Sequence, residues 1–494
     1  MVFSNAVFLF AFLPVTIGVY FLLEWLDRRV GKNGGLKAET WNLRNYWLLM
    51  VSIVFYAWTK PEFTVILIAS ILLNYFGAFL IDVSAKTWKR KVALGGTVFL
   101  NLALLFYFKY FNLTMNTINK FLSPGNQISF VEVALPIGIS FFTFQGLSYV
   151  VDVYRGTVPA QKRLSNLAMY VSMFPQLIAG PIVRYSDINS EVGCRHTTLS
   201  DFAQGAERFI IGLFKKVMIA DTMALVADPI FATPTTELSV SALWVGILAY
   251  AMQIFFDFSG YSDMAIGLGR IFGFHFVENF NYPYISKTIT EFWRRWHISL
   301  SSFFRDYVYI PLGGNKKHVY LNIAIVFLLT GIWHGAAYTF IAWGIWHGMF
   351  NITEKLLKNY VAPKLTWRPG KVLSAILGGL QHLYALFVVL IGWVLFRVDG
   401  LHNATNYIMS MFGGGTNQAL YTAGWFVNNQ ALFIFALAIL MSTPLLKYAC
   451  DKVSGILPET LYSVLKYVLL LLLLLLCVMA VASNTYSAFI YFQF

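Results

Sequence analysis

Long apolar runs recur along this chain, and they constrain its fold more than any other feature. The longest, VYLNIAIVFLLTGIWHGAAYTFIAWGIWHGMF at 319–350, contains no acidic or basic residue other than His334 and His347. A helix needs roughly 20 apolar residues to cross the hydrocarbon core of a bilayer. We therefore expect an all-α, polytopic membrane protein with roughly ten to thirteen membrane helices. The other expected spans lie near 5–25, 45–58, 62–82, 92–111, 133–151, 203–225, 239–258, 372–396, 431–449 and 461–483.

The composition agrees with a membrane protein. Of the 494 residues, 58% are hydrophobic and only 12% are charged, whereas a soluble protein carries roughly 25% charged residues. The net charge of +13 comes from basic residues in short loops, so it is typical of membrane orientation and does not indicate a nucleic acid partner. We expect one membrane domain over residues 1–494.

The distribution of basic residues predicts the topology. Segments 26–44, 86–91 and 155–163 are rich in Lys and Arg, whereas 226–240 and 403–430 contain neither. Because cytoplasmic loops carry the excess of Lys and Arg, the first group should be cytoplasmic and the second external. This arrangement places both the N-terminus and the C-terminus outside.

Two segments within the apolar regions are unusual. FPQLIAGPIVRY at 174–185 breaks an apolar run with two prolines and a glycine, and it is either a re-entrant element or an interfacial loop. QIFFDFSGYSDMAIGLGRIFGF ends an apolar run with several polar residues, and an acid there needs a cation or hydrogen-bond donors. Its glycines do not form a dinucleotide fingerprint. The polar residues are Gln253, Asp257, Ser259, Ser262 and Asp263.

No metal site is expected. The three cysteines, Cys194, Cys450 and Cys477, lie far apart, without the spacing of a metal site or of a disulfide framework.

The segment ITEFWRRWHISLSSFFRDYVYIPLGG at 289–314 gathers many of the scarce charges among aromatic residues. Thr288 and Glu291 match a capping box, and Pro311 followed by glycines supplies a stop. The spacing predicts one amphipathic helix. A first polar stripe holds Arg294, His297, Ser301 and Arg305, and Arg295 falls on a neighbouring stripe. Such a helix either lies in the cytoplasmic interface or carries part of a functional site.

His334 is the second candidate. A histidine deep in an apolar run is costly to charge and is a functional hypothesis by default. Gly331 and Gly335 flank Trp333 and His334, so the backbone there can bend or let a ligand approach. His347 lies nearer the polar end of the run, where an interfacial role is expected.

Several long motifs resemble the membrane-bound O-acyltransferases, and within them the bacterial alginate O-acetyltransferase type. The resemblance extends from residue 1 to about 400, with a motif-rich core at about 130–350 and less diagnostic helices at about 370–494. The motifs are FFDFSGYSDMAIGLG, ENFNYPYISKTITEFWRRWHISLSSFFRDYVYIPLGGN, GIWHG, MVFSNAVFLFAFLP, LPIGISFFTFQGLSYVVDVYRG, FPQLIAGPIVRY and KKVMIAD.

The resemblance implies helices around a central funnel or tunnel, with two polar residues near its narrow point. His297 in RRWHIS and His334 in GIWHG match these catalytic positions. Desolvation would keep His334 neutral, so that it can act as general base, while His297 would polarise the acyl carbonyl or orient the donor. Donor-binding or tunnel-lining positions would be Arg294, Arg295, Ser301, Arg305, Asp257 and Trp333.

The resemblance also implies the substrates and the location. Acetyl-CoA would be the donor substrate, with no bound cofactor, and its phosphates would meet the arginines at the cytoplasmic mouth. The acceptor would be an exported polysaccharide, most simply alginate, reached across a bacterial inner membrane through a separate SGNH-hydrolase-like partner, with membrane lipid around the chain. Alternatives are peptidoglycan or cellulose as acceptor, or D-alanyl transfer to teichoic acid. A transporter with His334 and Asp257 as a proton relay is the alternative of another class.

Overall fold

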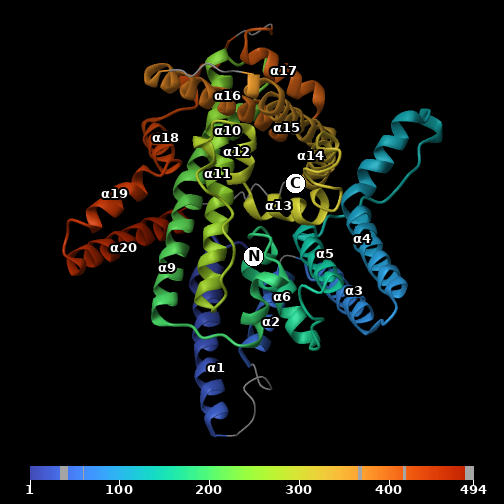
Figure 1. Ribbon diagram of the computed structural model, residues 1–494. Helices are drawn as coiled ribbons and strands as arrows, with labels where there is room; N and C mark the ends of the chain where they lie inside the picture. The colour runs from blue at the N-terminus through green and yellow to red at the C-terminus, as the bar shows by residue number, and fades with distance from the viewer. Residues whose placement is uncertain (34–42, 59, 365–369, 416–418, 484–494) are drawn as a thin grey trace. The chain divides into compact units, whose positions relative to one another are not determined.

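The structure, a computed structural model, describes residues 1–33, 43–58, 60–364, 370–415 and 419–483. These residues are mostly helical, and the one β-type pairing among them joins Leu238 to Tyr421. The chain forms two compact units, one of residues 1–213 with 261–277 and one of residues 214–260 with 278–494 (Figure 1). The expected location of the C-terminus outside the membrane concerns residues beyond the described ones.

The first unit contains most of the N-terminal half of the chain. Its helices are η1 (Phe8–Phe12), α1 (Leu13–Asn33), α2 (Leu43–Ala57), α3 (Phe63–Val83), α4 (Thr87–Phe121), η2 (Pro124–Asn126), α5 (Ile139–Arg155), α6 (Leu164–Ser172), α7 (Phe174–Leu177), α8 (Tyr185–Gly193) and α9 (Leu199–Phe214), together with the C-terminal turns of α11 (Val240–Ile271).

Buried polar side chains join the helices of the first unit. Asn74 of α3 and Asn101 of α4 exchange two amide hydrogen bonds of 3.1 and 3.0 Å. Arg195 donates to the Tyr20 hydroxyl at 3.1 Å and to the Asn45 amide oxygen at 2.7 Å. Such hydrogen bonds hold membrane helices together where apolar surfaces alone give little specificity.

The second unit contains the candidate catalytic residues. Its helices are η3 (Lys215–Ala220), α10 (Asp221–Ala232), most of α11, η4 (Pro283–Ile285), α12 (Ile289–Arg295), α13 (Ile298–Phe304), η5 (Arg305–Tyr309), α14 (Val319–His334), α15 (Tyr338–Leu356), η6 (Leu357–Val361), η7 (Ala362–Lys364), α16 (Lys371–Arg397), α17 (Leu401–Met411), η8 (Ala423–Trp425), α18 (Asn429–Met441), α19 (Leu445–Ser454) and α20 (Glu459–Ser483).

The apolar run at 319–350 is two helices, not one. The helix α14 ends at His334, and α15 begins at Tyr338. Glycines let the two helices approach closely, since a Cβ at Gly331 would lie 2.5 Å from the Phe340 carbonyl oxygen and 3.3 Å from the Gly344 Cα. At the break, a Cβ on Gly335 would overlap the Phe340 ring. The predicted bend beside His334 is confirmed, and the hairpin presents His334 at its turn.

The expected single amphipathic helix at 289–314 is wrong. The segment forms α12, α13 and η5, with a break at Trp296 and His297. The backbone of an upstream segment without regular secondary structure pairs with the chain at the break, where Asn281 N donates to Arg295 O and Ile298 N donates to Asn279 O, each at 2.9 Å. The backbone N–H and C=O groups that a continuous helix would pair with each other are therefore hydrogen-bonded to the upstream segment. The predicted N-cap is confirmed, with the Thr288 hydroxyl accepting from Glu291 N at 3.0 Å.

Six helices among the described residues are long and apolar enough to cross a membrane, and the bent pair α18 and α19, which meet at 71°, brings the number to seven. The six are Phe8–Asp27, Phe63–Val83, Thr87–Phe121, Val240–Ile271, Lys371–Arg397 and Glu459–Ser483. This number is below the expected ten to thirteen because several apolar runs are shorter helices, as in α2 and α14, or are divided among elements, as at 203–225.

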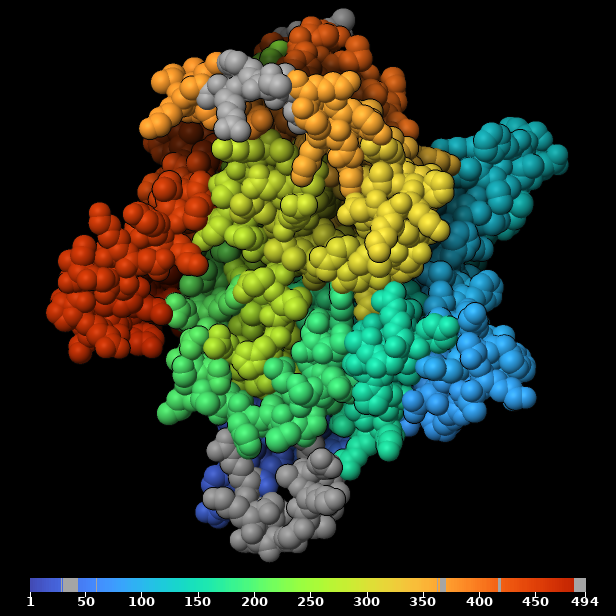
Figure 2. Space-filling view, viewed as in Figure 1, coloured from blue at the N-terminus to red at the C-terminus, as the bar shows by residue number. Residues whose placement is uncertain are grey.

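Several of these helices expose apolar side chains on their surfaces. On the face shown in Figure 2, much of α4 (blue to cyan) and α20 (red) is uncovered. Leu469 and Leu472 of α20 and Phe99 of α4 are all more than half exposed, at 57%, 53% and 69%. Contact with lipid explains such surfaces, so the chain is a polytopic membrane protein.

The segment FPQLIAGPIVRY contains only the short helix α7, and residues 171–183 are buried at every position. Protein therefore covers this broken backbone, as broken backbone in a membrane requires.

Candidate active site

His297 lies at the break between α12 and α13, in a left-handed backbone conformation with φ of 46°. Its side chain is fully buried, and Nδ1 lies 3.0 Å from Oδ1 of Asn279. The same oxygen accepts hydrogen bonds from the hydroxyl and the backbone N–H of Ser299, at 2.8 and 3.3 Å. The other ring nitrogen, Nε2, has no hydrogen-bond partner among the described residues. One nitrogen is therefore anchored, and the other is available.

Aromatic rings surround the His297 imidazole. The ring of Phe258, from α11, meets it edge to face with centroids 4.6 Å apart, and Trp333 lies at 5.9 Å. Burial among these rings lowers the pKa of His297 to about 3. The imidazole is therefore neutral at physiological pH.

His334 contacts Trp333, the same tryptophan that contacts His297. The Trp333 ring, whose centroid is 4.9 Å from that of His334, contacts both histidines. Trp343 of α15 and Phe396 of α16 meet His334 at 4.8 and 5.1 Å in steep edge-to-face arrangements. The structure thus brings His297, Trp333 and His334 together, although they come from two chain segments.

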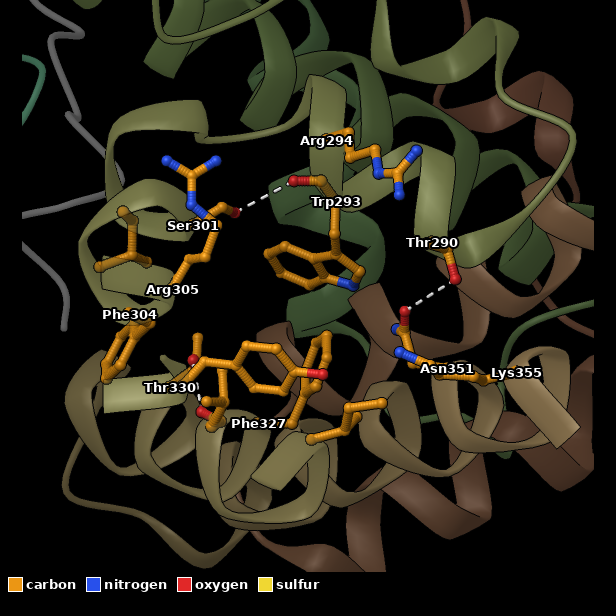
Figure 3. Close-up of a pocket in the computed structure, with 14 residues that line it drawn as sticks. Thr290, Trp293, Arg294, Ser301, Phe304, Arg305, Phe327, Thr330, Asn351 and Lys355 are labelled. Carbon is orange, nitrogen blue, oxygen red and sulfur yellow. Dashed lines mark hydrogen bonds between the residues drawn. The ribbon is translucent and has the colours of Figure 1, made fainter. Parts of the chain in front are cut away.

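A pocket of about 260 Å³ lies in the second unit, and neither the two histidines nor Trp333, an expected lining residue, is among the residues that line it. Figure 3 shows it with Arg294, Ser301, Arg305 and Lys355 around it and the Trp293 indole along one wall. The Ser301 hydroxyl donates to the Trp293 carbonyl oxygen at 3.0 Å. The other residues that line the pocket are Thr290, Leu300, Phe304, Tyr309, Ile323, Val326, Phe327, Thr330 and Asn351.

The pocket is lined by positively charged side chains. Its lining residues include Arg294, Arg305 and Lys355 and none of the described carboxylates. Arg305 is bonded to Asp306 at 2.7 Å, and Lys355 to Asn315 at 2.6 Å. Burial, together with the neighbouring Lys358 and Arg294, lowers the pKa of Lys355. An anion in the pocket would relieve this crowding of positive charge.

Trp293 connects the pocket with the histidines. It forms part of the pocket wall, and its ring meets that of Trp343 at 5.4 Å. Trp343 in turn contacts His334. A continuous series of aromatic contacts therefore leads from the cationic pocket to His334.

Two expected site residues are placed elsewhere. Arg295 pairs with Glu291 at 3.0 Å and donates to the Asn281 carbonyl oxygen, while Arg294 beside it lines the pocket. Asp257 pairs with Lys216 at 2.8 Å, and Lys216 also reaches Asp221 at 2.7 Å. The expectation that an acid here needs a cation is confirmed, and Asp263 likewise pairs with Arg208 at 2.9 Å.

Sequence reasoning missed Asn279, Trp343 and Lys355. Asn279 lies within the motif ENFNYPY, but its spacing from His297 carries no periodic signal. His347, for which an interfacial role is expected, has a fully buried side chain. The close approach of α16 and the aromatic rings of α12 covers it, since a Cβ on Gly392 would lie 2.5 Å from its Nε2.

Comparison with known proteins identifies the family. The model of the membrane-bound O-acyltransferase family matches residues 161–394. A probable alginate O-acetylase of Pseudomonas aeruginosa is 44% identical over 85% of this chain and 76% of its own. That of Pseudomonas putida is 40% identical over the full length of both chains. A peptidoglycan O-acetyltransferase of Helicobacter pylori is 33% identical over 84% of this chain and 80% of its own. The chain therefore belongs to the membrane-bound O-acyltransferase family and is an acyltransferase.

Proposed function

We propose that the protein takes an acetyl group from acetyl-CoA at the cytoplasmic face of a bacterial inner membrane and passes it across for O-acetylation of an exported polysaccharide of the alginate type. The relatives named alginate O-acetylase support this acceptor. The observation that carries the proposal is the series of contacts from the cationic pocket through Trp293 and Trp343 to His334.

The pocket suits the phosphates of the donor. Acetyl-CoA carries its phosphates at one end and the thioester at the end of a long, flexible arm. Arg294, Arg305 and Lys355 would hold the phosphates, and guanidinium groups suit phosphate oxygens especially well. The arm would then run along Trp293 and Trp343, so that the thioester reaches His334 and His297.

The transfer exchanges one acyl bond for another. The oxygen of an acceptor hydroxyl attacks the thioester carbonyl carbon, a C–O bond forms, and the C–S bond breaks. His334 takes the hydroxyl proton as general base, and the proton finally resides on the thiol of CoA. His297 orients the donor. The buried site excludes water, which would otherwise hydrolyse the thioester.

The attacking hydroxyl in this step belongs to a separate hydrolase-like protein outside the membrane. A hydroxyl of the polymer then attacks the ester so formed, which moves the acetyl group to the polymer and returns the proton to the partner's hydroxyl. Peptidoglycan is the second candidate acceptor, and the relative from Helicobacter pylori supports it. Both acceptors present hydroxyl groups on a glycan, so the chemistry is the same.

Radiolabelled acetyl-CoA tests the proposal. The label would be added to membranes that contain the partner together with wild-type protein, His297→Ala or His334→Ala. Immunoblots would match the protein amounts. We expect ester-linked label on one extracellular glycan with wild type and its loss in both variants. Normal labelling in His334→Ala would refute the catalytic assignment, and the labelled glycan identifies the acceptor.

A further inference from the structure

The hydrogen bonds around Asn279 fix the location of the only proton on the His297 ring. The backbone N–H of Ser299 can only donate, and it points at the same amide atom of Asn279 as the Ser299 hydroxyl and His297 Nδ1. That amide atom must therefore be the oxygen. A nitrogen 3.0 Å from a carbonyl oxygen carries a proton, so Nδ1 is the N–H of the imidazole.

The remaining nitrogen must then be an acceptor. A neutral imidazole has one N–H and one lone pair, and burial keeps this ring neutral. The lone pair is on Nε2, which has no partner among the described residues. A fully buried acceptor without a partner is costly, and because Asn279 holds Nδ1, this acceptor lies at a fixed position where it can bind a donor group of a ligand.

We propose that Asn279 is a positioning residue that holds His297 with its proton on Nδ1, so that Nε2 accepts a hydrogen bond from an amide N–H of the acyl donor. This inference rests on the proposed function for the identity of the donor. Asn279 itself is buried, at 1% exposure, and acts through His297.

The tautomer decides between the two roles that the sequence left open for His297. Polarising the acyl carbonyl would require an N–H at Nε2, because a carbonyl oxygen only accepts. Orienting the donor requires a lone pair there, and the arm of acetyl-CoA carries amide N–H groups between its phosphates and its thioester. The hydrogen bond to Asn279 therefore selects orientation of the donor.

Nitrogen-15 spectroscopy of histidine-labelled protein in lipid bilayers tests the tautomer without any activity. The signals of His297 are those missing from His297→Ala. We expect wild type and Asn279→Asp to show a protonated Nδ1 and a bare Nε2, and Asn279→Leu to show a protonated Nε2. A protonated Nε2 in wild type would overturn the proposal, and this spectrum remains decisive even if Asn279→Leu does not fold.

Kinetic measurements test whether this tautomer of His297 orients the acyl donor. We expect Asn279→Leu to raise the KM for acetyl-CoA about tenfold while kcat changes less. Asn279→Asp keeps an acceptor, so its KM should lie close to that of wild type. Asn281→Leu is the matched control, since Asn281 is close in sequence but exposed and bonds through its backbone. An unchanged KM in folded Asn279→Leu would overturn the donor-orienting role. If wild type shows the expected tautomer but transfers no acetyl group, the proposed function fails and the assignment of Asn279 to the tautomer stands.

Discussion

His297 and His347 are both fully buried in the second unit, yet their surroundings differ in one decisive respect. His297 is anchored through Nδ1 by Asn279 at a break in the helix. His347 lies inside the continuous helix α15, and neither of its ring nitrogens has a hydrogen-bond partner among the described residues. Its ring is packed against Trp293 and Trp343, at 5.2 and 5.1 Å.

The difference shows that burial alone does not identify a functional histidine. Both side chains are shielded from water, but only His297 has a polar partner that determines which nitrogen presents a lone pair. The rings around His347 instead surround it as they would a phenylalanine, and weak contacts of N–H groups with ring faces can stabilise it there. We therefore expect His297 to serve the reaction and His347 to serve packing.

Replacing each histidine gives the largest expected contrast. We expect His297→Ala to lower the rate of acetyl transfer about a hundredfold or more, because a misplaced donor costs this much. His347→Phe, which keeps a flat ring in the aromatic cluster, should stay within about threefold of wild type. Ester acetate on the exported glycan, normalised to the amount of each protein in the membrane, measures both. Equal losses of acetyl transfer in the two variants would contradict the distinction between a functional His297 and a packing His347.

Packing around His347 can be tested through the glycine opposite it. In Gly392→Ala the new Cβ would lie 2.5 Å from His347 Nε2, and the enclosed ring cannot move away. We expect a loss of about 1–3 kcal/mol in the free energy of unfolding, as for other overpacked sites. Thermal unfolding in detergent measures the effect.

Two further variants sharpen this test. Gly379→Ala lies on the same helix with nothing within 4 Å of the new Cβ, so it should not destabilise the protein. Adding His347→Ala should relieve the clash and raise the Tm of Gly392→Ala. A Gly392→Ala protein as stable as Gly379→Ala would show that His347 is loosely packed.

The pocket beyond Trp293 should affect donor affinity and not the chemical step. We expect Arg294→Gln and Lys355→Gln each to raise the KM for acetyl-CoA about tenfold, because each removes a charge-assisted contact with phosphate. Arg295→Gln is the matched control, since Arg295 pairs with Glu291 away from the pocket. With acetyl-pantetheine, which lacks the phosphates, the three variants should behave alike. A KM effect that persists with acetyl-pantetheine would contradict phosphate binding in the pocket.

The smallest expected effect is on the pH dependence of stability. The pKa of His297 is about 3 in the folded protein, against 6.5 for an unperturbed imidazole. Between these values the unfolded chain binds the proton and the folded chain does not, so acidification below pH 6.5 favours unfolding. His297→Gln does not titrate, so its Tm should fall less than that of wild type between pH 6.5 and 5. Parallel curves would show that His297 is protonated in the fold.

The sequence predicted the helical membrane class, the cap at Thr288, the bend beside His334 and the need of Asp257 for a cation, because each depends on local pattern or on the cost of burying charge. It did not predict the break at His297. There the helix is interrupted by hydrogen bonds with the backbone of Asn279, which accepts, and of Asn281, which donates; both lie well upstream and leave no trace in the helical period.

Because of that break, the four residues of the predicted polar stripe do not lie on one helix face. Arg294, Ser301 and Arg305 do line one pocket, but from three separate elements, and His297 turns instead toward Phe258 and Trp333. Lys355 joins the pocket from α15, a contact between distant segments that periodicity cannot reveal.

Acetyl transfer in sealed membrane vesicles of opposite orientation tests the central claim most directly. Radiolabelled acetyl-CoA would be added outside inside-out and right-side-out vesicles that hold the partner and the glycan, with wild type, His297→Ala and His334→Ala. We predict ester label on the glycan only with wild type, and only where the cytoplasmic face meets the donor. Label that is equal in both orientations, or that persists in both histidine variants, would contradict a histidine-dependent transfer across the membrane.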